Sequence, residues 1–316
     1  MYYTDFWIQE SNFLKEGGVG MEKNLELKED IYIKKNKQSK VKEILELLTS
    51  NKAALVGLII IVLLIFIAVF GKYIMPYNPY EGELSQSLQP PSSLHLFGTD
   101  EQGRDILSRV IDGTKISLRV GITSVAIALS VGTVFGAMAG YYGGKIDMII
   151  MRIMDIILAF PSLLLAIAFM SALGKGIDKA VIAISIVTIP EYARIVRSCV
   201  LSVKENEYVQ SAKAIGNGDM AIIFKHILPN VISPIIVRAT LGISTAILET
   251  SALGFLGLGV QPPLAEWGSM LGSGRGYFYN APHIILFPGF AITLTVLAFN
   301  LFGDGLRDAL DPKQRK

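Results

Sequence analysis

The chain alternates between long apolar stretches and shorter polar segments. The first apolar stretch, residues 53–70, contains no charged side chain. A run of roughly 18 or more apolar residues is long enough to cross the hydrocarbon core of a bilayer as a helix. Five later stretches predict further helices, at residues 120–140, 148–173, 180–198, 231–258 and 284–302. We therefore expect an all-α fold, a polytopic membrane bundle of six transmembrane helices, because lipid admits only helices or closed barrels.

The composition agrees with this pattern. Hydrophobic residues make up 51% of the chain and charged residues 18%, whereas soluble domains carry about 25% charge. This disfavours a soluble enzyme and excludes a disordered chain. The formal net charge of +2 is too small to indicate nucleic-acid binding. Cys199 is the one cysteine and the three histidines lie far apart, so we predict no disulfide framework and no metal site. We also expect no catalytic residue.

The distribution of charge predicts the orientation. Six lysines between residues 34 and 52 precede the first apolar stretch, and the positive-inside rule places such a segment in the cytoplasm. An even number of spans returns the C-terminus to the same side. The predicted divisions are a cytoplasmic segment 1–52, a first transmembrane helix 53–70, an extracellular loop 71–119, a core 120–303 containing a cytoplasmic loop 199–230, and a cytoplasmic tail 304–316.

The first 20 residues are a separate question. Lys15, Glu16 and Gly17 are encoded by purine-rich codons, which can form a ribosome-binding site just upstream of Met21. We therefore expect residues 1–20 not to be translated. The alternative is a genuine but poorly ordered extension, as chain termini often are.

Three glycines in the second span predict close helix packing. Gly132, Gly136 and Gly140 are spaced i, i+4, i+8 and therefore lie along one helix face. Bare backbone on such a face lets a second helix approach closely. The alternative is that glycine is simply frequent in membrane helices.

Among the acidic residues within predicted spans, where charge is costly, two are candidates for a functional role. Asp155 stands three residues after Arg152, so the two side chains can pair on one helix face and orient the helix at the interface. Glu249 lies deeper, in the fifth span. It either lines a pathway or binds a neighbouring helix, and the sequence does not separate these roles.

Residues 199–230 form a long polar segment that nevertheless has helical periodicity. Tyr208, Ala212 and Ile215 are spaced i, i+4, i+7, which predicts one apolar stripe. Gly216 opens a Gly-Asn-Gly break, and Asp219 is a suitable N-cap for a second short helix. Such an amphipathic helix either docks into a groove of a partner protein or lies on lipid headgroups.

This segment resembles the EAA loop of ABC importer permeases, whose pattern is Glu-Ala-Ala, three residues, Gly, nine residues and Ile-x-Leu-Pro. Gln210, Ser211 and Ala212 stand at the Glu-Ala-Ala positions, and His226 stands at the Ile position. The departures from Glu and Ala leave the helix–turn geometry intact. The positions that match the pattern unchanged are Ala212, Gly216, Leu228 and Pro229.

Other segments resemble one branch of that family, the dipeptide, oligopeptide and nickel permeases. The resemblance extends from about Thr49 to the C-terminus and includes these segments in order: 97–105, 140–144, 159–161, 255–263 and 303–312.

The resemblance implies a permease subunit of an ATP-driven importer in the cell (inner, cytoplasmic) membrane, with di- or oligopeptides as the expected substrate. It implies four kinds of neighbour besides membrane lipid: a second homologous permease, two ATP-binding subunits, and an extracellular substrate-binding protein. The chain itself would bind no cofactor, because ATP and Mg²⁺ would belong to the ATPases. No G-x-x-x-x-G-K-[ST] phosphate loop occurs in the sequence. The implied ATPase-coupling helix comprises Tyr208, Gln210, Ser211, Ala212, Ile215 and Gly216.

Two alternatives remain at this point. One is an importer of the same type for nickel or another small solute. The other is an ion-coupled secondary transporter, in which Glu249 and Asp155 would carry the coupling ion. Such transporters often contain inverted repeats and paired broken helices, and no clear repeat relates the two halves of this sequence.

Overall fold

The computed structural model describes residues 46–311, which fall into two units that meet at Ser50 and Asn51. The first unit is described only at 46–50, which are helical. The second unit is described from Asn51 onward. The predictions for residues 1–20, for the remainder of 1–45 and for 312–316 therefore lie outside the described residues.

Between residues 51 and 311 the structure is built from helices, with one isolated bridge between Thr99 and Asp105. The long helices are α2 (Lys52–Ile74), α3 (Ile106–Tyr142), α6 (Ile177–Val203), α9 (Ile232–Phe255) and α11 (His283–Leu310). The shorter α-helices are α4 (Gly144–Leu158), α5 (Ser162–Leu173), α7 (Glu207–Ala214), α8 (Asp219–Ala221) and α10 (Trp267–Gly274). Short 3-10 or π segments are η1 (Leu84–Gln86), η2 (Ile222–Ile227), η3 (Leu228–Asn230) and η4 (Arg275–Tyr277).

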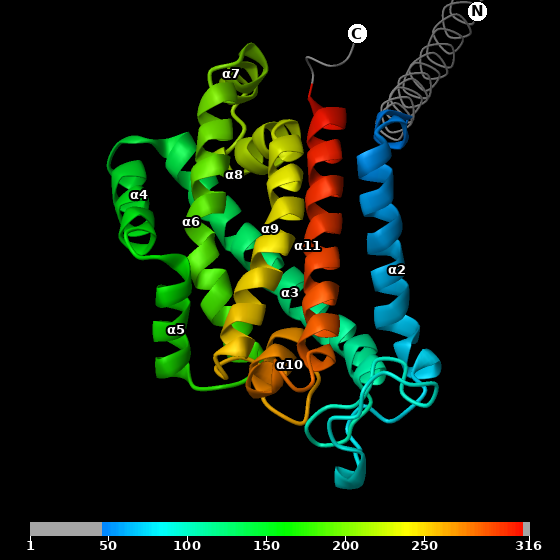
Figure 1. Ribbon diagram of the computed structural model, residues 1–316. Helices are drawn as coiled ribbons and strands as arrows, with labels where there is room; N and C mark the ends of the chain where they lie inside the picture. The colour runs from blue at the N-terminus through cyan, green and yellow to red at the C-terminus, as the bar shows by residue number, and fades with distance from the viewer. Residues whose placement is uncertain (1–45, 312–316) are drawn as a thin grey trace, which may run out of the picture. The chain divides into compact units, whose positions relative to one another are not determined.

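The helices of the second unit pack in a definite order. Helix α2 packs on α11, α11 on α9, α9 on α3, and α3 on α6, while α4 and α5 lie beside α6 (Figure 1). Helices α7 and α8 lie at the same end as the C-terminal end of α11, here named the α7 end. Helix α10 and the segment 75–105 lie at the opposite end, here named the α10 end (Figure 1). The bundle thus has two polar ends joined by apolar helices.

Within residues 46–311, four helices are long and apolar enough to cross a membrane: α2, α3, α9 and α11. The predicted third span, 148–173, is bent. Its two parts, α4 and α5, meet at an angle of 90° and would count together as a fifth span. The cause is Pro161, which lacks an N–H and disfavours helical geometry in the preceding residue. Helix α6 has 27 residues but five charged side chains, which lowers its apolar character.

The helix boundaries differ from the expected spans mainly in α3. This helix begins at Ile106, inside the expected loop 71–119, because the Asp105 side chain accepts a hydrogen bond from the Ser108 N–H and caps it. With 37 residues it is about 55 Å long, far longer than the roughly 30 Å of a hydrocarbon core. It ends at Gly143 (φ 67°), and Gly144 (φ 53°) opens α4, two backbone conformations that favour glycine. Figure 1 shows α3 running obliquely through the bundle.

The most extensive helix contact is that of α3 with α6. All three glycines of the predicted packing face lie against α6: a Cβ on Gly132 would be 2.6 Å from the Tyr192 Cβ, and one on Gly136 only 2.4 Å from the Ala193 carbonyl oxygen. A Cβ on Gly140 would likewise approach Val200 to 2.8 Å. The two backbones therefore meet with no side chain between them on the α3 side.

Hydrogen bonds between helices reinforce this contact. The Ser185 hydroxyl of α6 donates to the Ser124 carbonyl oxygen of α3 at 3.1 Å. On the other side of the bundle the Ser244 hydroxyl of α9 donates to the Asn300 Oδ1 of α11 at 2.7 Å. Small hydroxyl and amide groups of this kind stabilise helix pairs in an apolar surrounding.

Helix α10 fills the gap between α9, α11 and α3 at the α10 end. Trp267 is fully buried, and its Nε1 donates to the Val110 carbonyl oxygen of α3 at 3.0 Å. The preceding residue, Glu266, is also fully buried and caps α10 by accepting hydrogen bonds from the N–H groups of Gly268 and Ser269, both at 2.8 Å. Burial raises the pKa of Glu266 from 4.5 to about 7, although the two N–H donors oppose the shift.

The glycine contact gives the first prediction. Gly136→Leu should force α3 away from α6, because the new side chain would meet the backbone of α6, and overpacking of this kind costs about 1–3 kcal/mol or more. Thermal unfolding in detergent should show a lowered Tm. The control is Ala126→Leu, at an exposed position of α3, which should leave Tm nearly unchanged. Equal effects of the two substitutions would contradict the packing assignment.

The buried Glu266 gives the second prediction. A carboxyl whose folded pKa is raised adds stability below its unfolded pKa of 4.5, and this contribution is lost as pH rises towards about 7. Glu266→Gln remains neutral throughout, so its Tm should depend less on pH between 4.5 and 7 than that of the parent protein. Scanning fluorimetry at several pH values tests this, and parallel Tm curves for the two proteins would refute the role of Glu266.

Candidate functional site

The α7 end carries the predicted coupling helix. Helix α7 buries Val209 and Ala212, which are 3% and 4% exposed and pack in an apolar cluster with Val196, Ile222 and Ile235. The predicted stripe of Tyr208, Ala212 and Ile215 is therefore divided. Ala212 is buried with Val209 against the chain's own helices, whereas Tyr208 and Ile215 are exposed.

The adjacent side of α7 is open. Tyr208, Ser211 and Ile215 are exposed, at spacings i, i+3, i+7 that place them on one helix face. Ile215 is 80% exposed and Tyr208 39%. Met220 and Phe224, in the turn that follows, are also exposed. The α7 end thus presents apolar side chains on a helix that is held in place from behind, which is the arrangement of a docking surface.

The turn after α7 has the geometry that its glycine requires. Gly216 has φ +85°, a conformation that L side chains rarely adopt, with open space around its Cβ position. The N-cap of α8 is Gly218, and Asp219, the predicted cap, is instead the first residue of the helix. Its carboxylate accepts a hydrogen bond from the Tyr141 hydroxyl of α3 at 2.9 Å. Gln210 Nε2 donates to the Lys204 carbonyl oxygen at 3.2 Å and lies 3.3 Å from a Glu205 oxygen. These contacts fix the helix–turn unit on the ends of α3 and α6.

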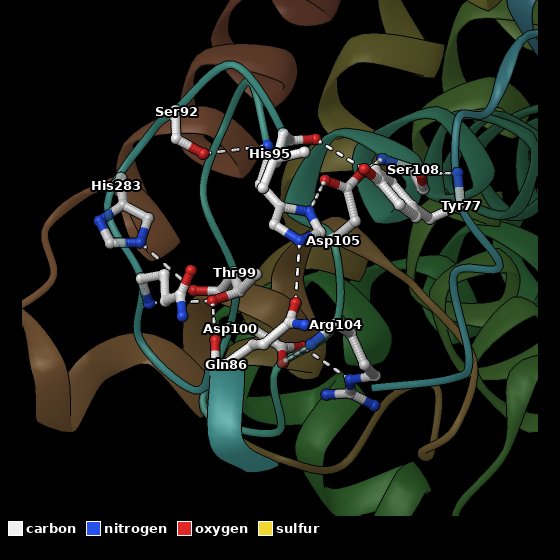
Figure 2. A network of polar contacts seen from close by, with 12 residues as sticks. Tyr77, Gln86, Ser92, His95, Thr99, Asp100, Arg104, Asp105, Ser108 and His283 are labelled. Atoms are coloured by element: carbon white, nitrogen blue, oxygen red, sulfur yellow. Dashed lines mark hydrogen bonds and ion pairs between the residues drawn. The ribbon is translucent and has the colours of Figure 1, made fainter. Parts of the chain in front are cut away.

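The α10 end is closed by a network of polar contacts within the segment 75–105 and the start of α3. His95 lies between two partners, with Nδ1 at 2.9 Å from Asp105 Oδ1 and Nε2 at 3.1 Å from Gln86 Oε1 (Figure 2). The other oxygen of Asp105 accepts from the Ser108 hydroxyl at 2.7 Å, and the Ser108 oxygen accepts from the Tyr77 N–H at 3.1 Å. The carboxylate that caps α3 therefore also organises the loop above it.

A second buried cluster of charges lies beside the first. Asp100 accepts from Arg104 Nε at 2.7 Å and lies 3.3 Å from Arg109 Nε, and all three residues are buried. The cluster is joined to α11 through Thr99, whose carbonyl oxygen lies 3.3 Å from His283 Nε2 (Figure 2). A segment held by so many charged contacts forms a rigid cap rather than a flexible linker.

Asp155 and Glu249 have partners that the sequence did not identify. Asp155 pairs with Arg194 of α6 at 2.6 Å, and not with Arg152, which is exposed. The sharp bend after α4 brings this helix alongside α6, so an interhelix pair replaces the expected one within α4. Glu249 forms a side-chain hydrogen bond with Ser162, the first residue of α5. It therefore links α9 to the break between α4 and α5.

Sequence reasoning missed Val209, Arg194, Glu266 and Trp267. Helical spacing alone could have indicated Val209, since it stands three residues before Ala212. Glu266 and Trp267 follow the glycine-rich and proline-rich stretch after α9. An acidic residue directly before a large aromatic residue could have indicated the start of a buried helix there. Within residues 46–311, no group of three or more His, Cys, Asp or Glu side chains is arranged to hold a metal ion.

Comparisons with known proteins agree with this geometry. Residues 132–316 match the family model described as "Binding-protein-dependent transport system inner membrane component". Residues 39–91 match "N-terminal TM domain of oligopeptide transport permease C". The first match covers more than half of the chain and includes the whole α7 end.

Similar curated proteins span nearly the same length. The dipeptide transport system permease protein DppC of Alkalihalophilus pseudofirmus is 54% identical over 274 residues, covering 87% of this chain and 90% of the relative. The di/tripeptide transport system permease protein DppC of Pseudomonas aeruginosa is 48% identical, covering 87% of this chain and 93% of the relative. The glutathione transport system permease protein GsiD of Pectobacterium atrosepticum is also 48% identical, covering 84% and 88%.

A solved structure has a related fold. A chain of the MetNI methionine ABC transporter in an inward-facing conformation matches with a TM-score of 0.53 and 18% identity, covering 65% of this chain and 98% of that chain. At this identity the likeness concerns the fold alone. Together with the family match and the relatives near 50% identity, the fold and the helix–turn unit at the α7 end establish that this chain belongs to the family of binding-protein-dependent transport system inner membrane components.

Proposed function

We propose that this chain is a permease subunit of an ATP-driven importer of di- or oligopeptides in the inner membrane. The substrate class rests on the relatives, which are named as permeases for dipeptides, di- or tripeptides and glutathione, itself a peptide. The observation that carries the coupling role is the helix α7, packed on the bundle by Val209 and Ala212 and open on its other face.

The proposed topology has six spans, formed by α2, α3, the α4–α5 pair, α6, α9 and α11. Helix α6 counts as a span because its charged side chains Glu191, Arg194 and Arg197 pair with neighbouring helices, so they need not face lipid. The α7 end is assigned to the cytoplasm together with both termini. Lys204, Lys213 and Lys225 near α7 support this by the positive-inside rule.

The proposed partner subunits are assigned to the α7 end and the α10 end of the bundle. Two ATP-binding subunits, which hold ATP and Mg²⁺, would bind the open face of α7 on this chain and the equivalent face on a second, homologous permease. Closure of the ATPases on ATP binding would then move α7 and, through its buried face, the ends of α3 and α6. The rigid cap at the α10 end would face an extracellular substrate-binding protein. This chain would bind no cofactor of its own.

The third prediction separates docking in a protein groove from contact with lipid headgroups. Ala212→Trp is not informative, because Ala212 is buried within this chain. Ile215 is exposed, so Ile215→Trp should leave folding and insertion unchanged. In a protein groove the larger ring should block recruitment of the ATPases and lower peptide uptake by about tenfold or more, whereas a tryptophan at the headgroups would be tolerated.

Co-purification of the ATPases and uptake of a labelled dipeptide measure the effect. Ile215→Leu, which keeps an apolar side chain of similar volume, is the control and should behave as the parent protein. Full uptake and normal ATPase recruitment by the Ile215→Trp variant would contradict the docking role of α7.

The fourth prediction tests the topology. In a Cys199→Ser background, a cysteine is placed at Ser93 near the α10 end or at Ser211 near the α7 end, both exposed positions. A membrane-impermeant thiol reagent should label Ser93→Cys in intact cells, and Ser211→Cys only after the membrane is opened. The reverse labelling pattern would overturn the proposed orientation.

A further inference from the structure

Helix α6 carries three interhelix ion pairs along its length. Arg197 pairs with Asp147 of α4 at 2.5 and 2.6 Å, Arg194 pairs with Asp155 of α4 at 2.6 Å, and Glu191 pairs with Arg238 of α9. Each pair is neutral as a whole. They follow one another from the α7 end towards the middle of the helix.

The Glu191–Arg238 pair lies deepest. Glu191 stands 14 residues from the first residue of α6, Ile177, and 12 from the last, Val203, which corresponds to about 21 and 18 Å along the helix. Its side chain is nevertheless 42% exposed, and that of Arg238 is 26% exposed. The preceding Pro190 has no N–H to donate, so a backbone carbonyl one turn earlier in α6 lacks its helical partner and adds a polar group nearby.

A half-exposed ion pair at this depth does not face hydrocarbon, because intramembrane charge is tolerated only towards protein or a water-filled cavity. Helix α2 shows the contrast. Its exposed residues are large and apolar, among them Val62, Leu63 and Phe66, as a lipid-facing surface requires. The α6–α9 side of the bundle is thereby marked as one that faces away from lipid, towards a water-filled pathway or the second permease subunit.

We propose that Glu191 and Arg238 form a contact site for the two charged ends of a free peptide while it crosses the membrane through the bundle. The proposal rests on the peptide-import function proposed above. The ammonium group of the peptide would bind the Glu191 carboxylate, and its terminal carboxylate would bind the Arg238 guanidinium. These two charges are common to all free peptides whatever their side chains, so a neutral pair of opposite charges suits a carrier of varied sequences.

Because Glu191 and Arg238 already pair with each other, the site should bind a peptide with low affinity, which suits transport. To bind the peptide, Glu191 and Arg238 must break their own ion pair, so each exchanges one charged contact for another. A conducting site has to bind its solute well enough to admit it and weakly enough to release it. A single fixed charge at this depth would instead leave an uncompensated group whenever no peptide is present.

The alternative is that the pair is a structural tie between α6 and α9, and paired substitutions separate the two roles. Glu191→Gln and Arg238→Gln each leave one charge without a partner, whereas the double variant removes both charges. If the ion pair only holds α6 and α9 together, the double variant should retain uptake, since replacing both members of an ion pair is often neutral. A contact site should remain defective in the double variant.

The test uses the complete transporter in proteoliposomes, with its ATPases and its binding protein, and labelled alanyl-alanine as the probe. The double variant is expected to lower uptake by about tenfold or more, the effect of losing a charged hydrogen bond, while the loaded binding protein still stimulates ATP hydrolysis. Recovered uptake in the double variant, or a parallel loss of uptake and stimulation, would overturn the proposal. Asp147→Asn, which breaks an ion pair nearer the α7 end, is the matched control and should change uptake and stimulation together, if at all.

A photo-crosslinking experiment tests contact directly and leaves the ion pair intact. Benzoylphenylalanine is introduced at Ile195, one turn from Glu191 on the same face of α6, or at Leu63, on the exposed face of α2. Labelled peptide should be captured at position 195 during turnover and not at 63. Capture at neither position would overturn the contact site. If the unmodified transporter takes up no peptide, the proposed import function fails as well.

Discussion

The contact between α3 and α6 determines where the other parts of the bundle lie. Three glycines leave the α3 backbone bare, so the two helices approach until a Cβ on Gly136 would touch the carbonyl of Ala193. This contact fixes α6, and α6 in turn holds α4 through two ion pairs and α9 through a third. The apolar cluster behind α7 contains residues of the same two helices, together with residues of η2 and α9. The α3–α6 contact thus helps to position both the bundle and helix α7.

The two ends of the bundle are built on opposite physical principles. At the α10 end, buried carboxylates and arginines such as Asp100 and Arg104 satisfy each other within the chain, which makes the cap rigid and complete. At the α7 end, the chain buries one face of a short helix and leaves apolar side chains such as Ile215 exposed. A rigid cap suits a surface on which a soluble protein lands, and an unfinished apolar face suits a subunit that stays bound.

Much of the fold was predictable because lipid imposes a simple rule on length and polarity. The apolar stretches gave α2, α9 and α11, and the glycine spacing indicated the face of α3 that meets α6. A proline within an apolar stretch indicates a bend, but an apolar count does not give the angle between the two parts at Pro161. Helical spacing allows both Ala212 with Ile215 and Val209 with Ala212 on one face of α7, and only the surrounding helices decide which pair is buried. The pairing of Asp155 with Arg194 depended on that same bend, which a local pattern does not contain.

The length of α3 has a mechanical consequence. Its first turn is fixed in the polar cap through Asp105, and Tyr141 in its last turn binds Asp219 beside the docking helix. One unbroken rod therefore joins the surfaces on the two sides of the membrane. A rod of about 55 Å that pivots at one end displaces its other end by roughly 1 Å for every degree of tilt. The glycine contact with α6 lies near the α7 end of this rod, so a tilt about that contact would move the α10 end much farther than the α7 end, in the manner of a lever arm.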